Sequence, residues 1–198
     1  ARFITKTLRD LGYLHFSEPF TKLFHQGTIT KDGAKMSKSR GNTVSPDEFI
    51  EKFGSDTFRA YLMFMGPFDE GGDWNDKGIT GIYRFLGKVW RICTSLDESN
   101  TLSKKDSVVI NKTIKGVSVD LEAMKFNTAI SKLMQYVNNF NSQKEVHVSV
   151  KQVLVQLLSP IAPHLCEEIW SILGNSDSIF DKEWLAYDDS LVLDDVIT

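Results

Sequence analysis

The sequence predicts a mainly α-helical chain, in which a short α/β piece precedes an antiparallel helical bundle. Apolar residues recur every three or four positions through most of residues 74–175, which is the period of helices buried on one face. Short β-prone runs and turn residues are concentrated before residue 66. The chain is 41% hydrophobic and 25% charged, the balance of a folded globular protein. We therefore expect three regions: 1–66, 67–175 and 176–198.

The first region mixes helix and strand signals. Apolar residues predict a helix over Phe3–Leu14, and Thr28–Thr30 is a β-prone run. Asp32–Gly33 is the dipeptide preferred in a two-residue hairpin turn. Ser45–Pro46, followed by Glu48, is typical of a helix start, and Gly54–Ser55 predicts a break before a second helix.

The second region carries helical stripes of apolar residues. Asn127 is the expected N-cap of the third stripe, and Pro160 and Pro163 should break the fourth. The stripes are Ile79, Ile82, Leu86, Val89, Cys93 and Leu96; Ile110, Ile114, Val117, Leu121 and Met124; Ile130, Leu133, Met134, Val137 and Phe140; and Val150, Val153, Leu154, Leu157 and Leu158, continued by Leu165, Ile169, Ile172 and Leu173. Short polar loops between such helices favour a bundle.

The third region is acidic, with six Asp, one Glu and one Lys from Asp177 onward, a net charge of −6. Its aromatic and apolar residues, namely Phe180, Trp184, Leu185 and Tyr187, are candidates to hold it across the bundle. Leu191–Leu193 and Val196–Ile197 are β-prone with nothing after them to pair with, so we expect the sequence to be cut before a further domain.

The composition argues for a cytoplasmic protein. Two cysteines cannot build a disulfide framework or a four-ligand zinc site, which indicates a reducing compartment. The first ten residues are too charged for a signal peptide. The longest uncharged run, Gln152–Cys166, is too short for a membrane span and contains two prolines. We expect no membrane partner.

The most informative segment is the basic loop over residues 33–42. Lys35 and Lys38, three positions apart among Ser and Gly residues, can close on one polyphosphate, and Ser37 and Ser39 add hydroxyl donors. Met36 is an apolar anchor that could dock the loop when it closes. A cationic loop that tightens as phosphate charge accumulates stabilises a transition state more than a ground state. The alternative is a solvated basic loop without a ligand.

Residues 35–39, Lys-Met-Ser-Lys-Ser, are identical to the KMSKS signature of class I aminoacyl-tRNA synthetases, and the chain resembles that family. The resemblance implies that residues 1–66 come from a Rossmann-like catalytic domain. It also implies that residues 35–39 bind ATP, that Lys35 and Lys38 are catalytic, and that Lys38 stabilises the pyrophosphate during adenylate formation. Mg²⁺ would accompany ATP as a substrate, with no cofactor tightly bound to this segment.

Further motifs resemble the bacterial leucyl type within this class. They are Arg84-Phe85-Leu86, Phe126-Asn127-Thr128-Ala129-Ile130 and Ser159-Pro160-x-Ala162-Pro163-His164, whereas Gly54-Ser55-Asp56-Thr57-x-Arg59 resembles a stretch of the class as a whole. The resemblance implies a fragment of a monomeric leucine–tRNA ligase that joins leucine to tRNA(Leu) through leucyl-adenylate, with an anticodon-binding-type bundle over 67–175. The family's His-x-Gly-His motif is absent, so we expect this segment alone to be inactive. The alternatives are a stand-alone tRNA-binding module and an isoleucyl-, valyl- or methionyl-type fragment.

A cationic stripe on the first helix of the bundle is the candidate tRNA contact. Arg84, Lys88 and Arg91 step by four and three, on the side away from the apolar stripe. Lys125 and Lys132 are weaker candidates, and a solvated helix face is the alternative for all five. We interpret His164 as a packed helix-start residue, Trp90 and Trp170 as core, and Asp73–Asp76 as a turn and cap. We expect no protein metal site.

Overall fold

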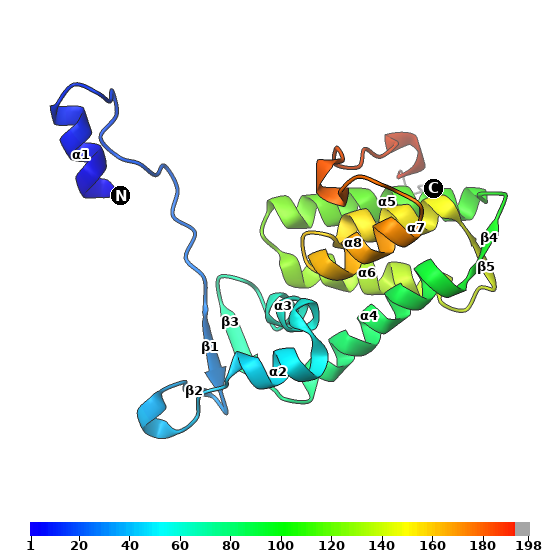
Figure 1. Cartoon of the computed structure of the whole chain (residues 1–198), viewed down its shortest axis with the longest axis horizontal. Helices are drawn as coiled ribbons and strands as arrows, with labels where there is room; N and C mark the ends of the chain where they lie inside the picture. The colour runs from blue at the N-terminus through cyan, green and yellow to red at the C-terminus, as the bar shows by residue number, and fades with distance from the viewer. Residues whose placement is uncertain (193–198) are drawn as a thin grey trace, which may run out of the picture.

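The computed structural model describes residues 1–192 of the 198-residue chain. Figure 1 shows an N-terminal arm, a small sheet with two helices beside it, and a helical bundle that carries the C-terminal segment. In chain order the elements are α1 (Arg2–Asp10), β1 (Thr28–Lys31), β2 (Ala34–Lys35), η1 (Lys38–Arg40), α2 (Pro46–Phe53), α3 (Ser55–Phe64), β3 (Gly71–Trp74), α4 (Gly78–Ser95), β4 (Asp97–Ser99), α5 (Lys104–Glu122), α6 (Phe126–Phe140), β5 (Glu145–His147), α7 (Val148–Leu158), α8 (Pro163–Ile172), η2 (Ile179–Asp181) and η3 (Asp189–Leu191). The predicted mainly α-helical class is confirmed.

The N-terminal arm, residues 1–23, stands away from the rest of the molecule (Figure 1). Its helix ends at Asp10, so the helix expected over Phe3–Leu14 is too long. Gly12 adopts φ +81°, and the N–H of Tyr13 returns to the carbonyl of Leu8, which closes the helix earlier. The apolar side chains Phe3, Ile4 and Leu8 of α1 are exposed.

The sheet has the order β2-β1-β3. The hairpin predicted at Asp32–Gly33 is confirmed, with both residues at positive φ (+54° and +71°) between antiparallel β1 and β2. β3 pairs parallel with β1, from Thr28 opposite Gly71 to Lys31 opposite Trp74. We did not predict β3. It ends at Trp74, the residue from which we expected the helical periodicity to begin.

Close backbone contact explains the glycines of β3. A Cβ on Gly71 would lie 2.3 Å from the carbonyl oxygen of Thr28, so only glycine allows this approach. The boundary expected after residue 66 therefore falls between α3 and a strand that pairs with β1.

Helices α2 and α3 lie between β2 and β3 in the chain, and both the start of α2 and the break between the two helices are where the sequence predicts. Pro46 is the first residue of α2, and Gly54, at φ +84°, separates the two helices. Trp74 is buried at the end of β3, and its ring lies edge-on against Phe49 and Tyr61. The indole of Trp74 thus anchors both helices to the sheet.

The bundle consists of α4–α8, and its core is built from the predicted stripes. Ile82, Val89, Ile130, Leu133 and Leu154 are all at most 1% exposed. The break expected at the two prolines is confirmed, because α7 ends at Leu158 and α8 starts at Pro163.

Several details of the bundle differ from expectation. The N-cap of α6 is Lys125, not Asn127, which lies inside the first turn. Trp170 is buried as predicted, but Trp90 is 39% exposed, so its assignment to the core is wrong. β4 and β5 pair parallel and were not predicted, since each has only three residues.

The acidic segment lies along α5, away from the exposed face of α4. The Trp184 indole donates to Ser118, the Asp188 N–H donates to Asn111, and Lys115 pairs with Asp189 at 3.0 Å. This confirms that Trp184 holds the segment across the bundle. Leu191 belongs to η3 instead of a strand. Residues 193–198, with the remaining β-prone residues, lie outside the described part.

Within residues 1–192, none of the helices has both the length and the apolar character needed to span a bilayer.

Candidate functional site

The KMSKS loop projects from the outer strand of the sheet (Figure 1). Asp73, on β3, holds the base of the hairpin, because its Oδ1 accepts hydrogen bonds from the Thr30 hydroxyl at 2.5 Å and the Gly33 N–H at 3.0 Å. The Thr30 hydrogen bond, followed by that of Gly33, lowers the pKa of the Asp73 carboxyl. We interpreted Asp73 only as part of a turn. Its contacts 40 and 43 residues away in the chain have no signal in the sequence.

Asn42 closes the loop from its other end. Its Oδ1 accepts the Ser37 N–H at 2.8 Å, and its Nδ2 donates to the carbonyl of Lys35 at 3.3 Å. The chain between them makes one 3₁₀ turn, η1, which ends at Gly41 with φ +67°. One amide side chain therefore braces the five-residue motif, a role that sequence reasoning missed.

The predicted ATP-binding residues differ in how far their side chains are exposed. The side chains of Lys35 and Lys38 are exposed, whereas Met36 is partly buried and packs against the core. The hydroxyls of Ser37 and Ser39 lie 2.8 Å apart. Lys38 borders an open hollow of about 400 Å³, and Lys35 is not among the residues that line it. Met36 is thus the docked side chain of the loop, and both lysines face solvent.

The hollow beside Lys38 is lined by groups of both charge signs. Lys31 and Lys38 line it together with the acidic residues Glu48 and Asp76. Asp76 also accepts the indole N–H of Trp74. In residues 1–192 no three His, Cys, Asp or Glu side chains are grouped closely enough to hold a metal ion. A polyphosphate that entered this hollow would meet the lysines directly, and a cation bound to it would face the carboxylates.

The three predicted tRNA contacts of α4 lie together on its exposed face. Lys88 donates to Asn138 at 3.3 Å, and Arg91 donates to the side chain of Asn141 at 2.8 Å and to its backbone carbonyl. Both partners lie toward the end of α6, so two of the three cations are held in place. Arg84 has no hydrogen-bond or ion-pair partner among residues 1–192.

The two weaker candidates lie apart from that face. Lys132 forms an ion pair with Asp120, which is 7% exposed, and donates to the carbonyl of Gly116. Its ammonium therefore joins α6 to α5. Lys125 borders a separate cavity of about 340 Å³, next to Phe24 and Phe68.

Two sequence motifs about a hundred residues apart meet at the junction of the sheet region and the bundle. Asp56, buried at the start of α3, accepts hydrogen bonds from Leu165 N–H at 2.7 Å and lies 2.8 Å from Nδ1 of His164. Arg59 donates to the carbonyls of Pro160 and Ile161. The Asp56 carboxylate thus caps the first turn of α8.

His164 differs from its expected role. It starts α8 as predicted, but its side chain is 76% exposed and not packed. Its position is defined by Asp56 rather than by burial.

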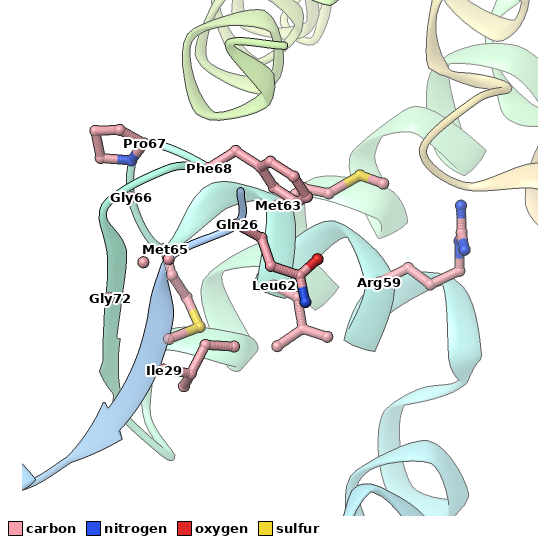
Figure 2. A pocket seen from close by; sticks show the side chains of 12 residues that line it. Gln26, Ile29, Arg59, Leu62, Met63, Met65, Gly66, Pro67, Phe68 and Gly72 are labelled. Carbon is pink, nitrogen blue, oxygen red and sulfur yellow. The ribbon is translucent and has the colours of Figure 1, made fainter. Parts of the chain in front are cut away.

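A smaller cavity of about 280 Å³ lies between α3 and the sheet (Figure 2). Ile29, Leu62 and Met65 point into it, and the Gln26 amide lies beside them. Arg59 borders the cavity, but its guanidinium is bonded to the carbonyls ahead of α8. The apolar lining suits an apolar group better than a phosphate.

Comparison with known proteins matches both halves of the chain. Residues 8–75 match the family described as tRNA synthetases class I (I, L, M and V). Residues 107–197 match the anticodon-binding domain of tRNA ligase. The first match includes the KMSKS loop, and the second begins in α5 and continues through the acidic segment.

Curated relatives match along the whole chain. Leucine–tRNA ligases from Dehalococcoides mccartyi, Clostridium perfringens and Thermosipho melanesiensis are 41%, 43% and 44% identical to it over 209, 216 and 219 residues. Each alignment covers 100% of this chain but only 26–27% of the relative. The chain therefore spans about a quarter of the length of these proteins.

A solved structure has the same fold. The LeuRS in the ternary complex of Agrobacterium radiobacter K84 LeuRS, tRNA and LeuAMS superposes with a TM-score of 0.82 at 31% identity, over 97% of this chain and 28% of that one.

Proposed function

Because the chain belongs to the class I tRNA synthetases, as a segment of the leucine–tRNA ligase type, we propose that it supplies the KMSKS half of an adenylation site and a tRNA-binding bundle. The whole enzyme would join leucine to ATP, release pyrophosphate, and transfer the leucyl group from leucyl-adenylate to tRNA(Leu). The observation that carries this proposal is the Lys-Met-Ser-Lys-Ser loop, braced by Asn42 and Asp73 with both lysines exposed.

The loop would act on the leaving group. A carboxylate oxygen of leucine attacks the α-phosphorus of ATP, and the bond to the β-phosphate oxygen breaks, so negative charge accumulates on the pyrophosphate. Lys38 would neutralise that charge, with Lys35 as a second cation and Ser37 and Ser39 as hydroxyl donors. Met36 would dock the loop through its apolar side chain. Mg²⁺ would enter with ATP, whose phosphates supply the oxygen ligands that this ion prefers.

The bundle would bind tRNA through the α4 stripe of Arg84, Lys88 and Arg91. Two of these cations are already oriented, Lys88 by Asn138 of α6 and Arg91 by Asn141 directly after it, which reduces the conformational entropy lost on binding. Lys125 is a further candidate. Lys132 is a poorer one, since it would have to leave Asp120. We expect a monomeric enzyme in the cytoplasm, in keeping with two free, buried cysteines.

Pyrophosphate exchange tests the proposal. None of the four histidines lies in a His-x-Gly-His motif, so the 198-residue chain alone should give no exchange. A full-length ligase that contains this segment should exchange pyrophosphate into ATP when leucine is present. Isoleucine, valine or methionine in place of leucine should not support the exchange. Exchange by a different amino acid would refute the leucyl assignment. A chain that binds tRNA while mutations in the loop of the full enzyme change nothing would favour the stand-alone binding module.

A further inference from the structure

An open groove lies where the start of α3, the exposed face of α4 and the first turns of α8 meet. Its volume is about 600 Å³. Phe53, Tyr83 and Trp90 supply aromatic walls, and His164 and Glu168 line it from α8. Tyr83 is 53% exposed and Trp90 is 39% exposed, which is unusual for two large rings on one helix face. We call this feature the α4 groove.

Helix α4 presents two parallel stripes with the same spacing. The aromatic stripe is Tyr83, Gly87 and Trp90, and the cationic stripe is Arg84, Lys88 and Arg91, so each cation directly follows a member of the first stripe. Both stripes step by four and three, which keeps each on its own line along the helix. The rings therefore border the groove, while the cations lie on the neighbouring strip of surface toward α6.

Gly87 opens a slot between the two rings. A Cβ built on Gly87 would have no atom within 4 Å, so the space above it is empty. Tyr83 and Trp90 are seven residues apart, which is roughly 10 Å along the helix axis. A flat ring can therefore lie over Gly87, in contact with one or both aromatic side chains.

We propose that the α4 groove binds an unpaired nucleotide of tRNA. Its base would stack in the slot over Gly87, and its phosphates would lie on the neighbouring cationic stripe. Aromatic stacking beside a basic track is the combination that holds single-stranded nucleic acid. The Glu168 carboxylate on the opposite wall repels phosphate but accepts hydrogen bonds from base N–H groups, so it favours the orientation with the base inside. This inference rests on the proposed tRNA-binding function and assigns it a specific site.

A substitution that fills the slot without changing charge tests the proposal. Gly87→Leu projects a side chain into the empty space, and Gly81→Leu is the matched control, since Gly81 is also exposed on α4 with no atom near its Cβ. The probes are a tRNA(Leu) transcript, a ten-nucleotide oligoadenylate and an RNA duplex of ten base pairs. Each is titrated into the 198-residue chain, and binding is followed by anisotropy and by tryptophan fluorescence.

Wild type should bind the transcript and the oligoadenylate, and binding should quench tryptophan fluorescence. The Trp90→Phe variant should not show this quenching. Gly87→Leu should weaken both by roughly tenfold, within the range measured for losing one stacked base, and leave the salt dependence and duplex binding unchanged. Equal binding by Gly87→Leu and wild type would refute nucleotide binding in the α4 groove but would leave the proposed tRNA-binding function intact. Equal weakening by Gly81→Leu would overturn it as well. A wild type that does not bind the transcript would overturn the tRNA-binding function itself.

Discussion

At the residue scale, the KMSKS loop combines rigid attachment with exposed charge. Asp73 and Asn42 fix its two ends through three short hydrogen bonds and one longer one, whereas Lys35 and Lys38 remain at the surface. A loop held at its ends can carry two ammonium groups to a phosphate with little loss of backbone entropy. Few buried contacts hold its middle, so we expect that part to be mobile without ATP.

Replacing Lys38 by Ala in the full-length ligase should slow leucyl-adenylate formation by about 10²–10³-fold, or ~3–4 kcal/mol, as for loss of one preorganised charge-stabilising donor. The effect should appear in kcat of pyrophosphate exchange, with little change in leucine affinity. Lys35→Ala is the matched control and should be milder, because Lys35 does not line the hollow beside Lys38. A Lys38→Ala enzyme altered only in its KM for leucine would contradict the assigned role.

Burial of Cys93 predicts a pH dependence of stability. Desolvation raises the pKa of its thiol from about 9 to about 12. The folded state therefore favours the neutral thiol, and this contribution is complete below about pH 9 and is lost as the pH rises toward 12. In urea unfolding between pH 9 and 11, the free energy of unfolding should fall by up to about 1.4 kcal/mol per pH unit from this group. Cys93→Ala should show a shallower decline.

At the element scale, helix α3 is fastened to α8 by one buried carboxylate. Asp56 accepts the backbone N–H of Leu165 from a site that is 8% exposed, whereas its partner His164 is largely in solvent. The two hydrogen bonds of Asp56 should therefore differ in their contribution to the free energy of unfolding. A buried N–H left without an acceptor costs more than an exposed imidazole left without one.

Asp56→Ala should lower the free energy of unfolding by about 1–3 kcal/mol, because it leaves the Leu165 N–H unpaired. His164→Ala removes only the exposed partner and should cost less than about 1 kcal/mol. Urea unfolding of the two variants and wild type measures both values. A His164→Ala cost equal to that of Asp56→Ala would show that the cap of α8 is not the main contribution.

The cationic stripe of α4 predicts weak, salt-dependent tRNA binding. Three phosphate contacts imply a log–log salt slope of roughly −2 to −3. The triple variant Arg84→Ala/Lys88→Ala/Arg91→Ala should lose most of that slope, measured at two salt concentrations or more. Lys104→Ala/Lys105→Ala, two exposed lysines of α5, is the control and should retain it. An unchanged slope in the triple variant would show that tRNA binds another surface, and Lys125 would be the next candidate contact.

Periodicity predicted the helices well and the strands poorly, for a physical reason. A helix such as α4 repeats its buried face over 18 residues, so its pattern is visible within one segment. β3 has four residues, and its partner lies some 43 positions earlier in the chain. The roles of Asp73 and Asp56 were missed on the same grounds. Each depends on a partner brought near only by the fold, whereas the KMSKS loop was recognised because all its residues are contiguous.

At the scale of the whole molecule, the arm and the body are energetically separate. The arm exposes large apolar side chains, among them Phe3, Tyr13 and Leu23, at 75% or more. Its ion pair, Arg2 with Glu18, lies within the arm itself. The aromatic contact of Phe24 with Phe68 marks where the chain joins the body.

Deleting residues 1–20 should therefore leave the thermal midpoint of the bundle unchanged within about 2 °C, because none of its buried core comes from that segment. The deletion should also lower binding of a hydrophobic dye, since it removes several highly exposed apolar side chains, among them Phe3, Tyr13 and Phe20. Calorimetry and dye fluorescence on the two chains measure both effects. A large drop in the midpoint would show that the arm contributes to the folded core.

The contact between Asp56 and His164 spans 108 residues, and this has a consequence for biosynthesis. A ribosome adds about 5–20 residues per second, so roughly 5–20 s pass between the synthesis of the carboxylate and that of its partner. During that interval α3 lacks its contact with α8, although α4 and α6, which also pack against α3, are synthesised earlier. Premature termination between residues 75 and 164 would release a nascent chain that contains the KMSKS loop and Asp73 but lacks the partner of Asp56 on α8, which makes such products substrates for chaperones and proteases.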